Sequence, residues 1–296
     1  MPRAYDPGMF ATLLGALPTP PAPSEVSNDV DQTIEIAVGA QEDAGLEPVT
    51  DGRLRAAFDR TISGEKVIEA WRSTQALTQR AVKQALPGPF SSGSPVEQLI
   101  EVVAALAEAG CPLVEIEETA IDRLADAGER DRFRQVHERL LGLAPGTELA
   151  ASTHLSLSIV GAAADPSAWE TVLALPYASL AVDLIAGPDS WNLVTRWPGK
   201  RGVVAGVESS GRTDEPREVL LWAAHYAAST QRRGMNRVGL GSAGSFANLT
   251  WDAAVRKMRL LGEVARLATM PAGEDLYRSL DPRAVSPRRA ALGHDG

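Results

Sequence analysis

The most regular feature of this chain is an alternation between short apolar runs and longer amphipathic stretches. The short runs are β-branched, or end at glycine or proline, which is typical of buried strands. Eight of them cover residues 12–18, 46–52, 81–89, 112–120, 148–156, 178–187, 202–209 and 236–244. Because these runs are too hydrophobic for a sheet with one face in water, the pattern indicates a parallel sheet covered by helices.

Helical stretches with recognisable starts separate these runs. Ser94 followed by Pro95 predicts a helix start with a serine cap and a proline in the first turn. Asp165 and Thr250 predict two further starts, and Gly45 predicts a left-handed helix stop.

Eight strand and helix units in under 300 residues fit a single (β/α)8 TIM barrel of the α/β class. A doubly wound open sheet is the competing interpretation. We expect the barrel to occupy residues 1–285. Residues 286–296 have mixed charge and no apolar period, which predicts a mobile tail.

Composition narrows the choice of partner and compartment. The net charge of −9 argues against nucleic acid or an anionic membrane as a partner, because phosphates must be met by clustered Lys and Arg. No stretch reaches the ~20 apolar residues of a membrane span. A single cysteine, Cys111, excludes an internal disulfide and any site built on several thiolates. We therefore expect a cytoplasmic protein that acts on a small molecule.

In a barrel, reactive groups gather at the carboxyl ends of the strands. The ends of the eight runs supply Asp51, Arg53, Lys83, Glu115, Glu117, His154, Ser156, Asp183, Glu208, Ser242 and Ser245. The sequence thus predicts a mouth lined by carboxylates, one histidine and small residues.

Several of these residues have a structural alternative. Asp51 precedes a glycine and could be a turn residue. Glu115 and Glu117 lie two apart and share a strand face, whereas Glu118 points the other way. Two carboxylates inside a barrel are costly unless they are paired or ligating, which favours a functional role for Glu117. His154 could be a metal ligand, a general base or a satisfied polar group at a strand end.

Seven segments, taken in order, resemble the catalytic barrel of the cobalamin-independent methionine synthase family, which belongs with uroporphyrinogen decarboxylase among barrel enzymes. They read "LLGALPTPP", "AQEDAGLEPVTDGRL", "VKQALPGPF", "LAEAGCPLVEIEETAI", "THLS", "GVESS" and "GSAGSF". Each match is weak alone, but their order and barrel spacing make the set fairly specific.

The resemblance implies a zinc ion, held by one histidine, two cysteines and a glutamate, that activates the thiol of homocysteine for methyl transfer from a folate. His154 stands at the histidine position and Asp183 at the glutamate position. The cysteine positions hold Ser156 and Ala243, which cannot replace thiolates. We therefore expect a degraded zinc site, with His154 and Asp183 as the ligands of any metal that remains.

Two further departures concern the substrate. Arg53 occupies the acidic position of the family's "DGE" turn, and Glu117 occupies its "DEP" aspartate. If Arg53 points into the mouth, it favours an anionic group such as a carboxylate. The alternative is a solvated residue at a helix start.

The leading hypothesis is a methionine-synthase-like enzyme that transfers a methyl or other alkyl group, or performs related chemistry, on a small polar and anionic substrate. In it, His154 is a general acid or base, Asp183 its partner, and Glu117 a substrate-binding carboxylate. The remaining predicted substrate-binding residues are Arg53, Asp51, Glu115, Ser156, Glu208, Ser242 and Ser245. The alternatives are a zinc-dependent enzyme that makes methionine from homocysteine, a lyase or decarboxylase, and a catalytically silent ligand-binding barrel.

Overall fold

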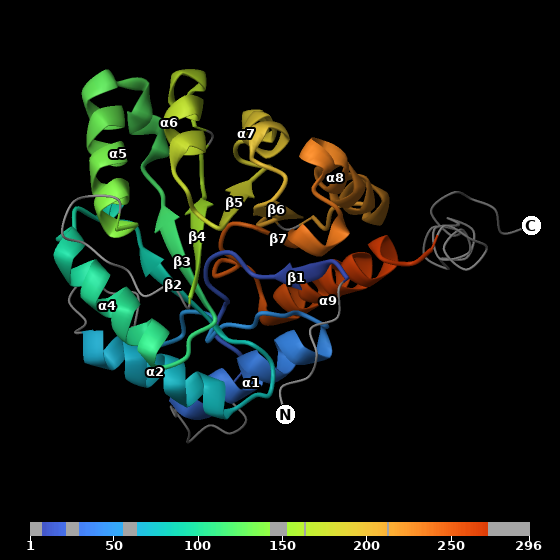
Figure 1. Cartoon of the computed structure of the whole chain (residues 1–296). Coiled ribbons are helices and arrows are strands. Elements are labelled where there is room, and N and C mark those ends of the chain that lie inside the picture. Colours follow the sequence, from blue (N-terminus) through green and yellow to red (C-terminus); the bar gives the residue numbers. More distant parts are fainter. Residues whose placement is uncertain are drawn as a thin grey trace, which may run out of the picture.

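Seven parallel strands form one curled sheet with helices on its outer face (Figure 1). The computed structural model describes residues 8–21, 30–55, 64–142, 153–162, 164–211 and 213–271. The strands are β1 (Phe10–Thr12), β2 (Lys83–Pro87), β3 (Leu113–Glu118), β4 (His154–Ile159), β5 (Ser179–Asp183), β6 (Gly202–Ser209) and β7 (Val238–Ala243). The helices are α1 (Val30–Asp43), α2 (Gly64–Ala76), α3 (Pro89–Ser92), α4 (Val96–Glu108), α5 (Ala127–Leu140), α6 (Trp169–Ala174), α7 (Trp191–Arg196), α8 (Arg217–Ser229) and α9 (Trp251–Ala268). The strands lie in the sheet in the order β1-β7-β6-β5-β4-β3-β2, which confirms the parallel α/β class.

The eighth strand, expected at 46–52, is reduced to an isolated bridge between Val49 and Val82. Its backbone nevertheless reaches both edges of the sheet. The Glu47 amide donates to the Ala11 carbonyl of β1 at 2.8 Å, and the Lys83 amide of β2 donates to the Val49 carbonyl at 3.0 Å. Because Pro48 has no amide hydrogen, this segment cannot form a regular ladder. The described residues therefore hold seven strands and a bridge rather than eight strands.

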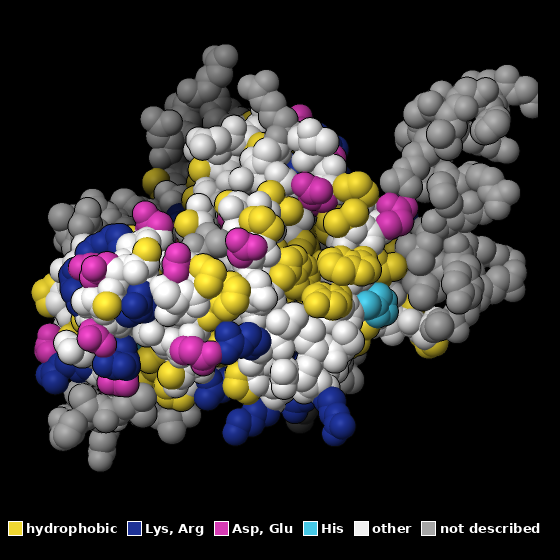
Figure 2. Space-filling model, turned by 90° about the horizontal axis from the view of Figure 1, so that it is seen from above, with side chains coloured by type: hydrophobic (Ala, Val, Ile, Leu, Met, Phe, Trp, Pro, Cys, Tyr) yellow, Lys and Arg dark blue, Asp and Glu magenta, His cyan; other side chains and the backbone are white. Residues whose placement is uncertain are grey.

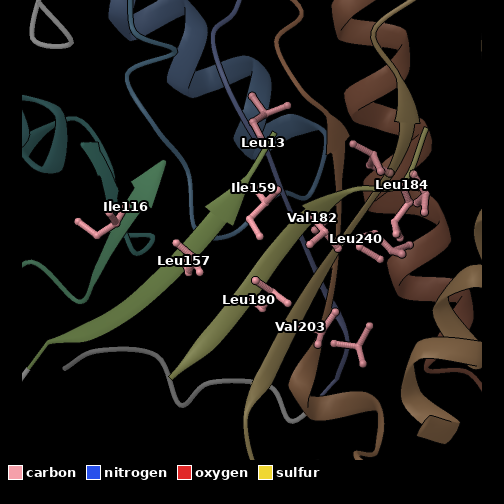
Figure 3. Packing of buried hydrophobic residues seen from close by; sticks show 14 of the residues in the cluster. Leu13, Ile116, Leu157, Ile159, Leu180, Val182, Leu184, Val203 and Leu240 are labelled. Carbon is pink, nitrogen blue, oxygen red and sulfur yellow. The ribbon is translucent and has the colours of Figure 1, made fainter. Parts of the chain in front are cut away.

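The two faces of the sheet differ in chemistry. On β4, Leu157 and Ile159 belong to the hydrophobic core (Figure 3). Ser156 and Ser158 alternate with them and lie on the inner face. The inner face carries its own small apolar cluster of Leu14, Val160, Ala181 and Val204. The rest of the inner face of β2, β3 and β4 is largely polar, and this is the part of the fold that positions the candidate site.

The predicted helix ends are mostly confirmed. The Thr250 side chain caps α9 by accepting from the Ala253 amide at 3.3 Å, and Asp165 caps the turn before α6 by accepting from the Ser167 amide. Gly45 has φ of 81°, the left-handed conformation expected after α1. The start at Ser94 is wrong by one residue: Pro95 has extended backbone, so α4 begins at Val96 without a side-chain cap.

Two further expectations from the sequence concern the carboxyl-terminal tail and membrane-spanning helices. The predicted boundary at 285 and the tail at 286–296 lie outside the described residues. Within the described ranges, no helix combines the length and apolar character that crossing a membrane requires.

An aromatic cluster lies on the surface of α7 and α8. Trp222 and Tyr226 stack with ring centroids 5.0 Å apart, and Trp191 meets both rings edge-on. Trp222 is 56% exposed. Seen from above, hydrophobic side chains gather in one area to the right of centre (Figure 2). We call Trp191, Trp222 and Tyr226 the surface aromatic cluster.

A fully buried polar chain links β3 to α5 and to the segment before β5. Glu118 Oε1 lies 3.1 Å from His137 Nε2, and His137 Nδ1 lies 2.7 Å from the Tyr177 hydroxyl. Burial raises the pKa of Tyr177 well above its usual value, and the Glu118 charge adds to the shift. Tyr177 is therefore a neutral hydrogen-bonding group at physiological pH.

Replacing Tyr177 with phenylalanine is expected to lower the free energy of unfolding by about 1–3 kcal/mol, because one buried imidazole nitrogen loses its partner. Urea denaturation measures the change. Tyr226→Phe, in the surface aromatic cluster, is the matched control and should change stability by less than about 0.5 kcal/mol. Equal effects of the two substitutions would contradict the argument.

Candidate active site at the carboxyl ends of the strands

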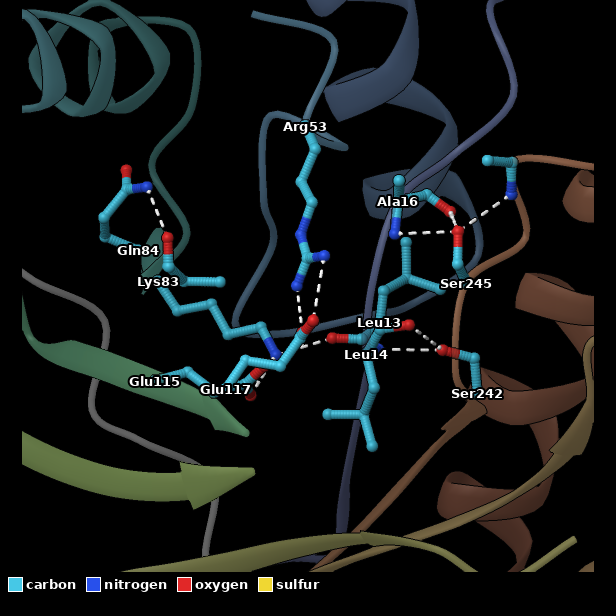
Figure 4. A network of polar contacts seen from close by, with 12 residues as sticks. Leu13, Leu14, Ala16, Arg53, Lys83, Gln84, Glu115, Glu117, Ser242 and Ser245 are labelled. Carbon is cyan, nitrogen blue, oxygen red and sulfur yellow. Dashed lines mark hydrogen bonds and ion pairs between the residues drawn. The ribbon is translucent and has the colours of Figure 1, made fainter. Parts of the chain in front are cut away.

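Glu115 and Glu117 both lie on the inner face of β3, as their spacing predicted. They are only 2% and 5% exposed. Glu118 lies on the outer face, where its carboxylate accepts the amides of Phe90 and Ser91 at 3.0 and 2.7 Å. Two carboxylates thus enter the barrel, and both have a cationic partner there (Figure 4).

Lys83 is the first residue of β2, not at its carboxyl end as the sequence predicted, and its long side chain reaches Glu115. The Lys83 ammonium donates to Glu115 Oε2 at 2.8 Å and to the Leu13 carbonyl at 2.5 Å. The side chains of both residues are 2% exposed. Glu115 Oε1 has no hydrogen-bond partner among the described residues, so one acceptor faces inward unused.

Arg53 pairs with Glu117 through two parallel hydrogen bonds. Arg53 Nη1 donates to Glu117 Oε1 at 3.1 Å, and Nη2 donates to Oε2. Arg53 also has φ of 57°, a left-handed conformation that is uncommon outside glycine. Its guanidinium therefore points into the mouth, and it is not a solvated residue at a helix start.

Asp51 lies in the turn between Thr50 and Arg53. Its carboxylate accepts the Arg53 amide at 2.8 Å. Burial raises the pKa of Asp51, although that hydrogen bond and the charges of Arg55 and Arg53 oppose the shift. A raised carboxyl pKa in a cleft is typical of a group that exchanges protons.

Asp51, Arg53, Lys83 and Glu115 line a cavity of about 10 Å³. That volume holds about one water molecule. In this conformation the side chains around this cavity leave no room there for a larger ligand.

Ser156 and Ser158 extend the polar inner face. The strand register pairs Ser156 with Glu115 and Ser158 with Glu117, which puts the four side chains on one face. Both hydroxyl groups are buried without a hydrogen-bond partner in the described part of the chain. Ser156 is among the residues predicted from the sequence and Ser158 is not, although both belong to the same Leu-Ser-Leu-Ser alternation.

Asp183 ends β5 on the same inner face. Its Oδ1 accepts the amides of Ile185 and Ala186 at 2.9 and 2.8 Å, and Oδ2 accepts the Gly161 amide at 3.4 Å. These contacts fix the turn after β5. Asp183 reaches the mouth, but among the described residues its carboxylate accepts hydrogen bonds from backbone amides.

The expectation that His154 lies at the mouth is wrong. His154 is the first residue of β4 and therefore lies at the amino ends of the strands, opposite Asp183. Its Nε2 lies 2.8 Å from the Ser179 hydroxyl. Burial lowers the pKa of His154, so the imidazole is neutral at pH 7. It pairs with neither Asp183 nor Glu117.

Glu208 misses the predicted mouth, whereas Ser242 and Ser245 lie at the carboxyl end of β7 and contact backbone there. A register shift between Gly206 and Glu208 turns Glu208 outward, where it accepts from Lys257 of α9 at 2.5 Å. Burial raises the pKa of Glu208, and Lys257 opposes the shift. The Ser242 hydroxyl bonds the Leu14 backbone, and exposed Ser245 bonds the Ala16 backbone.

The residues present do not fit a zinc ion. No three His, Cys, Asp or Glu side chains of the described ranges group closely enough to hold a metal. At the end where Asp183 lies, β4 offers Ser158, the residue after β4 is Val160, and β7 offers Ala243. Burial raises the pKa of Cys111 to about 11, and this thiol lies before β3 at the opposite end.

Comparison with known proteins finds the fold but no sequence relative. No protein-family model matches the chain, and no curated protein matches it significantly. A B12-independent methionine synthase from Shewanella sp. W3-18-1, solved in complex with selenomethionine, matches with a TM-score of 0.70 at 13% identity, over 88% of this chain and 97% of that chain. A methyltransferase from Methanosarcina mazei matches with a TM-score of 0.59 at 13% identity, over 89% of this chain and 95% of that chain. The chain is thus similar in fold to methionine-synthase-like barrels.

Proposed function

We propose that this protein is a barrel enzyme that binds a small carboxylate-bearing molecule at the carboxyl ends of its strands and transfers an alkyl group without a zinc–thiolate centre. The observation that carries the proposal is the Arg53–Glu117 pair. A non-glycine residue held at φ of 57° presents a guanidinium to a buried carboxylate inside the mouth. Such strain is typical of functional sites, and the planar guanidinium matches a carboxylate in two-point contact.

The paired charges also define the complementary ligand. A zwitterionic amino acid supplies a carboxylate for Arg53 and an ammonium group for Glu117, so it can replace the internal ion pair without leaving either charge uncompensated. The Shewanella protein of similar fold was solved with such a molecule, selenomethionine.

Asp51 is the proposed general acid or base. It lines the same small cavity as Arg53 and Lys83, and its pKa is raised by burial, which brings proton exchange closer to neutral pH. His154, assigned this role from the sequence, lies at the other end of the barrel. Alkyl transfer, rather than another reaction class, is supported by the methionine synthase and methyltransferase of similar fold.

Ligand-dependent thermal stability tests the binding part of the proposal. L-Methionine is expected to raise the melting temperature, and L-methioninol, which lacks the carboxylate, is not. Arg53→Met should abolish the response. Arg123→Met, which removes an exposed ion pair with Glu129, should retain it. A response to methioninol equal to that of methionine would overturn carboxylate recognition.

Turnover tests the reaction. The assay follows transfer of a labelled methyl group from methyltetrahydrofolate to a panel of small amino and thiol carboxylates. We expect transfer to some of them, at a rate that a chelator does not change. In Asp51→Asn this rate should be about 10²–10⁴-fold lower. Loss of transfer with the chelator would overturn the zinc-free mechanism. If the protein binds a ligand but transfers the methyl group to none of the panel members, the proposed enzyme function is overturned. The remaining interpretation is a barrel that only binds its ligand.

A further inference from the structure

A second, larger cavity opens at the amino ends of the strands, opposite the candidate active site. Its volume is about 650 Å³. Phe10, His154 and Ser179 line it from the first residues of β1, β4 and β5. This volume is in the range of small-molecule sites, which span about 300–1,000 Å³.

The cavity combines apolar walls with one polar pair. Phe10, Leu113 and Val204 contribute apolar surface on the inner side. His154 Nε2 and the Ser179 hydroxyl, 2.8 Å apart, lie among them. A neutral imidazole and a hydroxyl supply both donors and acceptors, which suits the polar part of a mainly apolar ligand.

The charges around the cavity are biased toward one sign. Lys200, Arg201 and Arg237 line it, and among the described residues Glu47 is the carboxylate that lines it. Glu47 already accepts the Ala81 amide at 3.2 Å. In a chain with a net charge of −9, three cations at one opening are contrary to the overall charge and complement an anion.

One of these cations is held in place. Arg201 Nη1 donates to the Leu175 carbonyl at 2.8 Å, and its guanidinium lies 5.2 Å from the Trp197 ring centroid. These contacts leave further guanidinium N–H groups for a ligand, since arginine has five donors.

We propose that this amino-end cavity binds a small organic anion with an apolar body. The anionic group lies at Lys200, Arg201 and Arg237, the body packs on Phe10 and Val204, and His154 with Ser179 bonds its polar substituents. The site is separate from the mouth and does not depend on the proposed alkyl transfer.

The probe is 1-anilinonaphthalene-8-sulfonate, an aromatic sulfonate whose fluorescence rises in apolar surroundings. We expect saturable binding to the full chain. The double variant K200Q/R237Q should weaken binding about five- to tenfold, because two rim charges are lost. Ala178→Trp, which adds a large side chain to the wall, should weaken it comparably.

The surface aromatic cluster is the competing binding place for this probe. The double variant W222Q/Y226Q should leave the affinity unchanged, and loss of binding in it would overturn the assignment. Unchanged affinity in both K200Q/R237Q and Ala178→Trp would also overturn it. The uncharged probe N-phenyl-1-naphthylamine should be insensitive to K200Q/R237Q, and equal sensitivity would contradict the role of charge. Circular dichroism of each variant confirms that it is folded.

Discussion

Replacing Lys83 with methionine is expected to lower the free energy of unfolding by about 3–5 kcal/mol. The substitution leaves the Glu115 carboxylate inside the barrel without its cation. Glu115 Oε1 already lacks a partner among the described residues, so no second hydrogen bond compensates for the loss. Guanidinium denaturation of the purified variant measures the change.

The double variant K83M/E115L separates loss of the pair from loss of the lysine. Removing both charges should recover most of the stability, because a buried ion pair is often replaceable by apolar groups of similar volume. The matched surface control is Arg134→Met, which removes an exposed pair with Asp131 and should cost less than about 1 kcal/mol. If Lys83→Met costs no more than this control, water reaches the Lys83–Glu115 pair, and the polar inner face is not the desolvated site described here.

The sequence alone predicts that Glu115 and Glu117 lie on the same face of their strand. A two-residue spacing within a strand places Glu115 and Glu117 together and Glu118 apart, whatever the precise strand ends, because side chains alternate along a strand. The same rule covers Ser156 and Ser158. Local periodicity was therefore enough to place the two carboxylates on one face, since it requires no knowledge of long-range contacts.

The position of His154 needed the strand ends, which periodicity does not fix. The sequence pattern predicts that the fifth apolar run ends near residue 156, and the resemblance of "THLS" to a family segment supports that boundary. The strand begins at His154 and continues to Ile159. A shift of a few residues moved the histidine from one end of the barrel to the other.

Partners distant in sequence were beyond prediction for a different reason. Arg53 and Glu117 are 64 positions apart, and the sequence is compatible with Arg53 facing either the mouth or water. In the structure the side chain turns inward to Glu117, from a left-handed backbone that the sequence pattern does not predict. The irregularity in β6 likewise turns Glu208 toward Lys257, which strand alternation alone could not predict.

Arg233 is a further buried cation, in addition to Lys83 and Lys257, and no sequence pattern predicts its burial. It is fully buried, and it donates hydrogen bonds to uncharged carbonyl and hydroxyl oxygens. Nη2 donates to the carbonyls of Val194 and Trp197 at the end of α7, at 3.2 and 2.7 Å. Burial lowers the pKa of Arg233 to about 10, so the guanidinium remains charged at neutral pH.

The same side chain reaches α8 and β6. Nη1 donates to the Ala227 carbonyl near the end of α8 at 3.2 Å and to the Thr230 hydroxyl at 3.1 Å, and Nε donates to the Arg201 carbonyl at 3.3 Å. The last carbonyls of a helix lack intrahelical partners and carry the negative end of its dipole. Arg233 thus satisfies two helix ends at once and connects them to the start of β6.

Replacing Arg233 with methionine is expected to lower the free energy of unfolding by about 3–5 kcal/mol, because several buried acceptors lose a charged donor together. Arg233→Lys should recover only part of the loss, since an ammonium group keeps the charge but cannot reach acceptors on both helices. Arg237→Met, which removes one bond to the Arg233 carbonyl, is the control and should cost less than about 1 kcal/mol. Full recovery by lysine would show that charge alone suffices, and the geometric argument for two helix ends would then be wrong.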